Sequence, residues 1–168
     1  MTADRAPARR WLTYVRERSP LPALLPVALA QSLSALFLFR PDFDAAAVAT
    51  STLGIIGLLV LMRLMDELKD HAKDRLAHPE RPLPRGLLTP DQVRRAVRLV
   101  GLALLGLAAA VATRDLVAGA LYAFTVGYAF LMYREFFAPR LLARNAFVYA
   151  VTHQLIVLPM YAFAVESM

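Results

Sequence analysis

Long stretches without a charged residue are the feature that most constrains this chain. The first covers Leu21–Phe39, and its 19 residues would form an α-helix about 28 Å long, enough to cross the hydrocarbon core of a bilayer. Four further apolar runs follow, each bounded by charged residues or a tight turn. They predict an all-α membrane bundle of about five transmembrane helices, with spans near residues 21–39, 45–65, 92–113, 116–133 and 145–165.

The composition supports a membrane protein and excludes several other classes. The chain of 168 residues is 58% hydrophobic, which is too apolar for an ordinary soluble domain. It has no cysteine, so disulfides and thiolate metal sites are excluded. The net charge of +6 does not predict nucleic-acid binding, because the basic residues flank apolar runs and form no patch with interleaved aromatics. The expected partner of this surface is the lipid bilayer.

The basic residues are distributed unevenly between the two ends of the predicted spans. Of the 19 lysines and arginines, 17 lie in an N-terminal arm, in residues 63–98 and in residues 134–144, whereas Arg40 and Arg114 lie on the other side. By the positive-inside rule, the three basic segments face the cytoplasm. We therefore expect a multi-pass protein of a bacterial or archaeal plasma membrane, with a cytoplasmic arm at 1–20 and a transmembrane domain at 21–168.

A charged segment at residues 63–90 separates the second span from the third. It carries Asp66, Asp70 and Asp74 at steps of four residues, a spacing that predicts a slowly drifting stripe along one helix face. Carboxylates of this kind suit Mg²⁺, which binds carboxylate oxygens together with substrate phosphates. The alternative is a solvated helix end in which Asp66 pairs with Lys69 and Asp70 with Lys73.

The run DELKDHAKDRLAHPERPLPRG, which covers 21 of the 168 residues, closely resembles the first aspartate-rich motif of the UbiA-type membrane prenyltransferases. That motif reads Asn-Asp-x-x-Asp-x-x-x-Asp, followed by a short spacer and Arg-Pro-Leu-Pro-x-Gly. The two later aspartates of the motif correspond to Asp70 and Asp74, and the basic turn begins at Arg81. This chain departs from the motif at two positions, since Asp66 replaces the asparagine and Glu67 the aspartate after it.

The resemblance implies half of a UbiA-like fold and a Mg²⁺-dependent transfer of an isoprenoid chain from a prenyl diphosphate to an unknown acceptor, aromatic or other. It implies that Asp70 and Asp74 are catalytic carboxylates. The site residues that we expect on this basis are Asp66, Asp70 and Asp74 as metal ligands, and Lys69, Lys73, Arg81 and Arg134 as diphosphate-binding groups.

Two alternatives to an active transferase stay open at this point. The UbiA-type enzymes carry a second aspartate-rich motif, and beyond Asp74 no acidic residues of this chain have such a spacing. The chain could therefore be a truncated enzyme, or a non-catalytic half that needs a second-half partner chain or a homo-oligomer. The other alternative is a membrane protein that binds metal or diphosphate without transferase activity.

Polar residues within or beside the later spans have two interpretations each. His153 and Gln154 lie inside the fifth span, where they would either orient an acceptor in a pocket or form an interhelical hydrogen bond. Arg134 follows the fourth span and would either bind diphosphate or serve as a basic anchor at the membrane surface. Pro159 is expected to kink the fifth span.

Overall fold

A computed structural model describes residues 7–39 and 44–167 of the chain. Residues 1–6, 40–43 and 168, among them Arg5 and Arg40, lie outside the described part. Within the described part every regular element is a helix. The elements are α1 (Pro7–Arg18), α2 (Leu21–Phe39), α3 (Ala45–Lys69), α4 (His71–Ala77), α5 (Pro90–Ala112), α6 (Leu116–Tyr133), the short 3₁₀ turn η1 (Glu135–Phe137), α7 (Pro139–Arg144), α8 (Ala146–Gln154) and α9 (Val157–Glu166).

The prediction of an all-α fold with five transmembrane helices is confirmed. In the described residues, α2, α3, α5, α6 and the pair α8–α9 are long and apolar enough to cross a membrane. Helix α5 begins with a capping box, in which Thr89 Oγ1 accepts from the Gln92 amide and Gln92 Oε1 accepts from the Thr89 amide. Pro90 follows at the first helical position, where its missing amide has no consequence.

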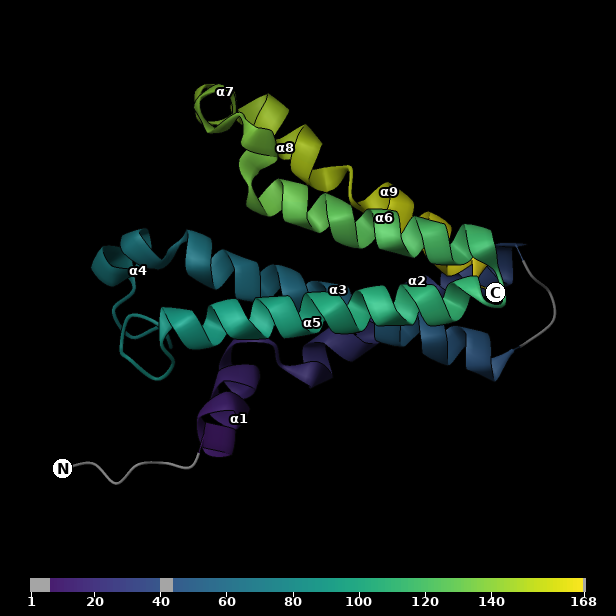
Figure 1. Ribbon diagram of the computed structural model, residues 1–168, viewed down its shortest axis with the longest axis horizontal. Coiled ribbons are helices and arrows are strands. Elements are labelled where there is room, and N and C mark those ends of the chain that lie inside the picture. Colours follow the sequence, from purple (N-terminus) through teal and green to yellow (C-terminus); the bar gives the residue numbers. More distant parts are fainter. Residues whose placement is uncertain (1–6, 40–43, 168) are drawn as a thin grey trace.

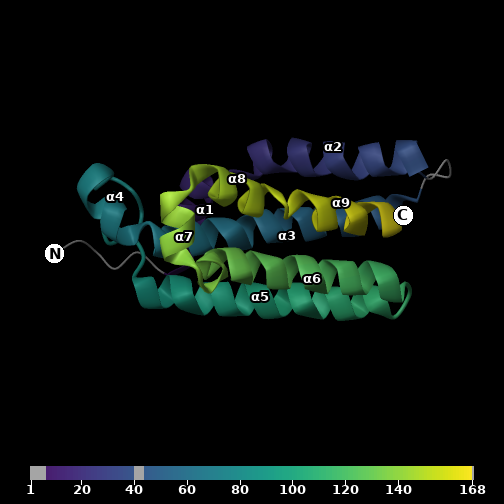
Figure 2. The ribbon, with the colours of Figure 1, turned by 90° about the horizontal axis from the view of Figure 1, so that it is seen from above.

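Helix α3 is the centre of the bundle and packs against α2, α5, α6 and α9. Figures 1 and 2 show α5 and α6 as an antiparallel hairpin beside it. The tight turn between them brings the two backbones close together. A Cβ added to Gly119 would lie only 2.6 Å from the backbone nitrogen of Ala112. Asp115 caps α6 by accepting a hydrogen bond from the Ala118 amide at 2.8 Å.

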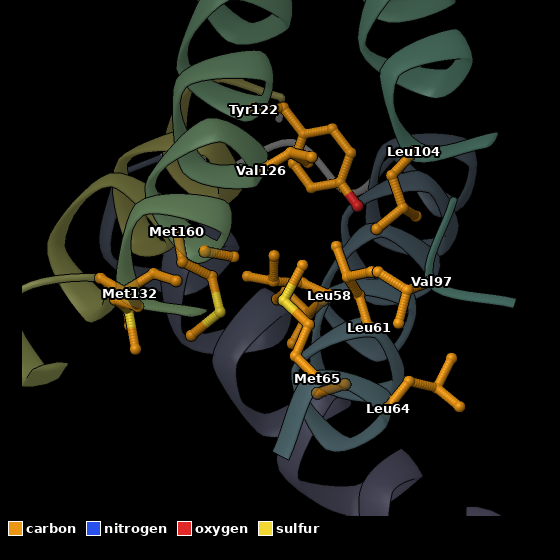
Figure 3. Close-up of a cluster of buried hydrophobic side chains, with 14 of the residues drawn as sticks. Leu58, Leu61, Leu64, Met65, Val97, Leu104, Tyr122, Val126, Met132 and Met160 are labelled. Carbon is orange, nitrogen blue, oxygen red and sulfur yellow. The ribbon is translucent and has the colours of Figure 1, made fainter. Parts of the chain in front are cut away.

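Both apolar packing and hydrogen bonds join the spans. Side chains from four helices meet in the core shown in Figure 3, including Leu58 of α3, Leu104 of α5, Val126 of α6 and Met160 of α9. Among the polar contacts, the Tyr122 hydroxyl of α6 donates to the Gly54 carbonyl of α3 at 2.7 Å. Hydroxyl groups also connect α2 with α3, since Ser32 bonds to Ser51 at 3.0 Å and to Thr52 at 3.1 Å. Such bonds between helices contribute about 0.6 kcal/mol each on average in a bilayer.

The two ends of the bundle differ in charge and shape. Helices α1, α4 and α7 lie at one end, which we call the motif end, whereas the C-terminus and the α5–α6 turn lie at the other (Figures 1 and 2). Towards the motif end α6 diverges from α3 and α5 (Figure 1). The described basic residues of α1, of residues 63–98 and of residues 134–144 are all at this end. Helix α1 runs across the long helices there and was not expected from the sequence.

The last span consists of two short helices with a break between them. Helix α8 ends at Gln154, α9 begins at Val157, and Pro159 lies in the first turn of α9. Proline lacks the amide for the bond to the fourth residue before it, and its ring meets that carbonyl. The Leu155 carbonyl instead accepts from the Leu158 amide at 3.1 Å. The kink expected from Pro159 therefore takes the form of a break at Leu155 and Ile156.

Candidate functional site

The helix that carries the aspartates bends in the middle of the motif. Helix α3 ends at Lys69, and Asp70 links it to α4 with φ −88° and ψ −3°. Backbone hydrogen bonds continue through the bend, because the Asp70 amide donates to the Asp66 carbonyl and the Asp74 amide to the Asp70 carbonyl, both at 2.8 Å. The stripe expected on one helix face is thus divided between two helices. Asp66 is exposed, Asp70 is half-buried and Asp74 is buried.

Asp74 and Arg81 bind each other. Arg81 Nη1 donates to Asp74 Oδ1 at 2.7 Å, and the side chain of Asp74 is only 3% exposed. This hydrogen bond raises the pKa of the Arg81 guanidinium, which stays charged at every physiological pH. The ion pair closes the loop between α4 and α5, where Leu83 and Leu88 are buried in the core. Arg81 therefore holds the Pro-rich turn in place in this structure.

Glu67 belongs to a different contact from its aspartate neighbours. Consecutive residues of a helix point about 100° apart, so Glu67 leaves the stripe and is buried, 1% exposed. Arg18 of α1 donates from Nε to Glu67 Oε1, whereas Oε2 has no partner among the described residues. Glu67, at the position of an aspartate in the family motif, thus attaches α1 to α3. No local spacing predicts this pair, because 49 residues separate its members.

A small pocket lies between α3, α6 and α8 at the motif end. Its volume is about 40 Å³, and Asp66 and Lys69 are its charged lining residues. The remaining lining residues are Met62, Met65, Ala129, Met132, Tyr133, Tyr149 and His153. The structure therefore brings two of the expected site residues together with a histidine that the sequence singled out for a pocket. Asp66 has no hydrogen-bond or ion-pair partner among the described side chains.

Lys69 contacts Glu135 and not Asp66, the partner assigned to it by the alternative of a solvated helix end. Its Nζ lies 2.9 Å from Glu135 Oε1 and 5.3 Å from the centre of the Tyr149 ring. The ion pair between Asp66 and Lys69 that their spacing of three residues suggests is therefore not formed. Glu135 comes from η1, where three successive residues have left-handed backbone angles: φ is 50° at Glu135, 51° at Phe136 and 57° at Phe137. Such angles are costly for residues with a side chain, and they place Glu135 above the pocket residue Lys69.

His153 is held inside the pocket by its own helix. Nδ1 lies 2.9 Å from the Tyr149 carbonyl, and the imidazole stacks on the Tyr149 ring at 3.9 Å between centroids. Only a protonated nitrogen can bond a carbonyl, so neutral His153 carries its proton on Nδ1 and a lone pair on Nε2. Nε2 is buried and has no partner among the described residues. The interhelical bond in this region comes instead from Tyr128, whose hydroxyl donates to the Thr152 carbonyl at 2.7 Å.

The other expected site residues lie outside the pocket. Lys73 is exposed on α4. Arg134 is also exposed, with its guanidinium 5.6 Å from the ring centre of Phe137. Gln154 is exposed at the end of α8. The residues that sequence reasoning missed are Glu135 and Tyr149, whose roles depend on contacts between helices far apart in the chain.

The described side chains do not form a three-carboxylate metal site. Within residues 7–39 and 44–167, no group of three His, Cys, Asp or Glu side chains lies close enough to hold one ion. Asp74 is paired with Arg81. Asp66 and Asp70, one helical turn apart, are then the carboxylates of the stripe that have no ion-pair partner among the described residues. One or two carboxylates together with substrate phosphates are the usual ligand set of Mg²⁺. Asp66 and Asp70 fit that smaller set.

The fold and the site define a multi-pass, all-α membrane protein with a polar pocket at one end of its bundle. In comparisons with known proteins, no family model, no curated protein and no solved structure matches this chain.

Proposed function

We propose that this protein binds a prenyl diphosphate at the motif end and transfers its isoprenoid chain to an acceptor within the membrane, as the UbiA-type prenyltransferases do. The observation that carries this proposal is the set of side chains around the pocket between α3, α6 and α8, whose volume of about 40 Å³ would have to widen to admit the substrate. It combines Asp66 and Lys69 at a polar end with three methionines and two tyrosines along its walls. A prenyl diphosphate has the same division into a charged head and an apolar chain.

The charged head would lie beside the bend in the motif. Asp66 and Asp70 would hold Mg²⁺, and Lys69 and Lys73 would donate to diphosphate oxygens. The ion, bound together with the diphosphate, would neutralise the charge of the leaving group. Asp74 and Arg81 would keep the turn closed beside this site, because they are already paired with each other at 2.7 Å.

The pocket residues would handle the chain and the acceptor. Met62, Met65 and Met132 would contact the first isoprene units and exclude water from the reacting carbon. In the transfer, the C1–O bond breaks with its electron pair left on diphosphate, and a bond forms between C1 and the acceptor. The proton of the acceptor leaves to a base, and His153 Nε2, buried and unpaired, would take it.

The orientation of the site follows from the charge of the motif end. The basic residues of the arm, of residues 63–98 and of residues 134–144 favour the cytoplasmic side by the positive-inside rule. Prenyl diphosphates and Mg²⁺ would then reach the pocket from the cytoplasm. A single cysteine introduced at Ala77, a residue exposed at the end of α4, tests this placement, because impermeant thiol reagents outside intact cells should not label it.

The test of the function is a pair of binding and transfer assays with the protein in lipid nanodiscs. We expect Mg²⁺-dependent binding of labelled geranylgeranyl diphosphate, weakened about 10-fold or more in Asp66→Asn and Asp70→Asn, which each remove a charged ligand. Asp91→Asn is the matched control, since Asp91 is exposed at the same end and, among the described residues, pairs only with Arg94. Transfer is then measured with a panel of aromatic and polyol acceptors.

Each outcome of these assays has a definite meaning. Equal binding by the wild type and the two aspartate variants would refute the site. Binding that needs Asp66 and Asp70 but gives no transfer to any acceptor would indicate a diphosphate-binding membrane protein. Transfer that is lost with either aspartate and retained in Asp91→Asn supports the proposal.

A further inference from the structure

A second cavity, separate from the pocket, lies between α1, α3 and α5. Its volume is about 450 Å³, within the range of about 300–1,000 Å³ typical of ligand pockets. Its apolar lining includes Val60 and Leu64 of α3 and Leu99 and Val100 of α5. We call this cavity the α1 groove. None of the residues assigned to diphosphate binding lines it.

Helix α1 is fixed firmly enough to form a wall of this groove. Tyr14 is buried, 1% exposed, and its ring meets Trp11 edge-on at 5.6 Å between centroids. Arg18, at the end of α1, is ion-paired with the buried Glu67 of α3. Figure 1 shows α1 lying across the long helices, the orientation of a helix in the plane of a membrane surface. Trp11 lines the groove and is typical of that interface.

The rim of the groove carries a positive charge that has no counter-ion in the described part of the chain. Arg95 lines the groove, is exposed and has no ion-pair or hydrogen-bond partner among the described residues. Its neighbour Arg94 is bound to Asp91 at 2.6 Å. One turn further along α5, Leu99 is 61% exposed beside the apolar part of the groove. An unpaired guanidinium thus lies at the level where α5 changes from polar to apolar.

We propose that the α1 groove is a binding site for one anionic phospholipid of the surrounding bilayer. Arg95 binds the phosphate, for which its forked donors are suited, and an acyl chain lies along Val60, Leu64 and Leu99. Arg9 and Arg16, which are exposed on α1, add positive potential at the same level of the membrane. This inference goes beyond the proposed function and does not depend on it.

The chain supplies its own probe for this site. It contains a single tryptophan, Trp11, which lines the groove. The full-length protein is reconstituted in mixed bilayers in which either phosphatidylglycerol or phosphatidylcholine carries brominated acyl chains, and quenching of Trp11 fluorescence is measured. We expect brominated phosphatidylglycerol to quench at a several-fold lower mole fraction than brominated phosphatidylcholine.

Two variants separate a built site from general charge attraction. Arg95→Gln should abolish the preference for the anionic lipid, and Arg95→Lys should retain most of it. Arg98→Gln is the matched control, because it removes the same charge from an exposed position of α5 that does not line the groove. Circular dichroism and elution as a single species establish that each variant is folded before its quenching is compared.

The results that would overturn the proposal are equally specific. Equal quenching of wild-type Trp11 by both lipids would mean that the groove contains bulk lipid only. An equal loss of preference in Arg95→Gln and Arg98→Gln would mean that overall surface charge attracts the lipid and that no site exists. Neither result would affect the binding of a prenyl diphosphate at the pocket.

Discussion

Asp74 and Arg81 form an ion pair in which the carboxylate is almost fully buried and the guanidinium is about one-quarter exposed. An aspartate of the aspartate-rich segment is therefore bound to the basic turn that follows it. This pair connects α4 to the loop that leads into α5. Asp74, the last carboxylate of the stripe, therefore stabilises the loop between α4 and α5 in this structure.

The first prediction tests that role. Arg81→Gln should lower the thermal unfolding temperature and increase hydrogen exchange in residues 71–88, because it leaves a buried carboxylate without its partner. Asp74→Asn should have a similar effect, and the double variant should be no worse than either single one, as expected of directly coupled residues. Arg85→Gln is the control, since Arg85 pairs with Glu17 at the surface and should change little. Additive losses in the double variant would contradict direct coupling.

The second prediction compares two buried tyrosines. The Tyr14 hydroxyl is buried without a partner among the described residues, so Tyr14→Phe should raise the free energy of unfolding by about 1 kcal/mol. Tyr122 donates to the Gly54 carbonyl at 2.7 Å, so Tyr122→Phe should lower it by about 1 kcal/mol. Unfolding in detergent micelles measures both. The same sign for both variants would show that the hydroxyl contacts do not decide the effect.

The third prediction concerns pH and follows from the environment of Tyr14. Burial, and then the nearby Glu67, raise the pKa of the Tyr14 hydroxyl well above its ordinary value of about 10. The unfolded chain loses this proton at about pH 10, whereas the folded protein keeps it. The free energy of unfolding should therefore fall as the pH rises above about 10. The fall should be smaller in Tyr14→Phe, and parallel curves would refute the assignment.

The fourth prediction uses two glycines of α6. A Cβ at Gly119 would lie 2.5 Å from the Cβ of Ala112, so Gly119→Ala should force the α5–α6 turn apart and cost about 1–3 kcal/mol. Gly127 has no atom within 4 Å of an added Cβ, and Gly127→Ala should stabilise the helix by about 0.5–1 kcal/mol. Opposite changes in the unfolding temperature are the expected readout. A neutral Gly119→Ala would mean that the turn can relax.

The fifth prediction depends on the proposed function. Glu135 Oε1 lies 2.9 Å from Lys69 Nζ. A diphosphate would compete with Glu135 for this ammonium group. Glu135→Gln should therefore tighten the binding of geranylgeranyl diphosphate a few-fold, consistent with about 0.2–1 kcal/mol for a partly exposed pair. Glu80→Gln is the control, because Glu80 is exposed and lies beside His78. Weaker binding in Glu135→Gln would mean that Glu135 positions Lys69 for the substrate.

The spans were predictable from the sequence because burial in lipid requires long uncharged runs, and such runs are visible without any contact. Helix α1 was not, because its turns mix arginines with Trp11 and Tyr14, and only docking on α3 explains that pattern. The bend at Asp70 was not predictable either, because aspartates spaced four residues apart are typical of a continuous helix. The partners of Glu67 and Lys69 depend on how distant helices meet, which local spacing does not determine.

The two halves of the last span differ in how strongly they are attached to the bundle. Helix α9 has Met160, Phe163 and Ala164 buried in the core, whereas none of the 9 residues of α8 is buried. Segments with few buried apolar contacts open at a low free-energy cost, independently of the rest of the protein. Because α8 carries Tyr149 and His153, one wall of the pocket comes from a helix without a buried residue. A local opening of α8 at the break before α9 would widen the pocket while the core around α3 stays folded.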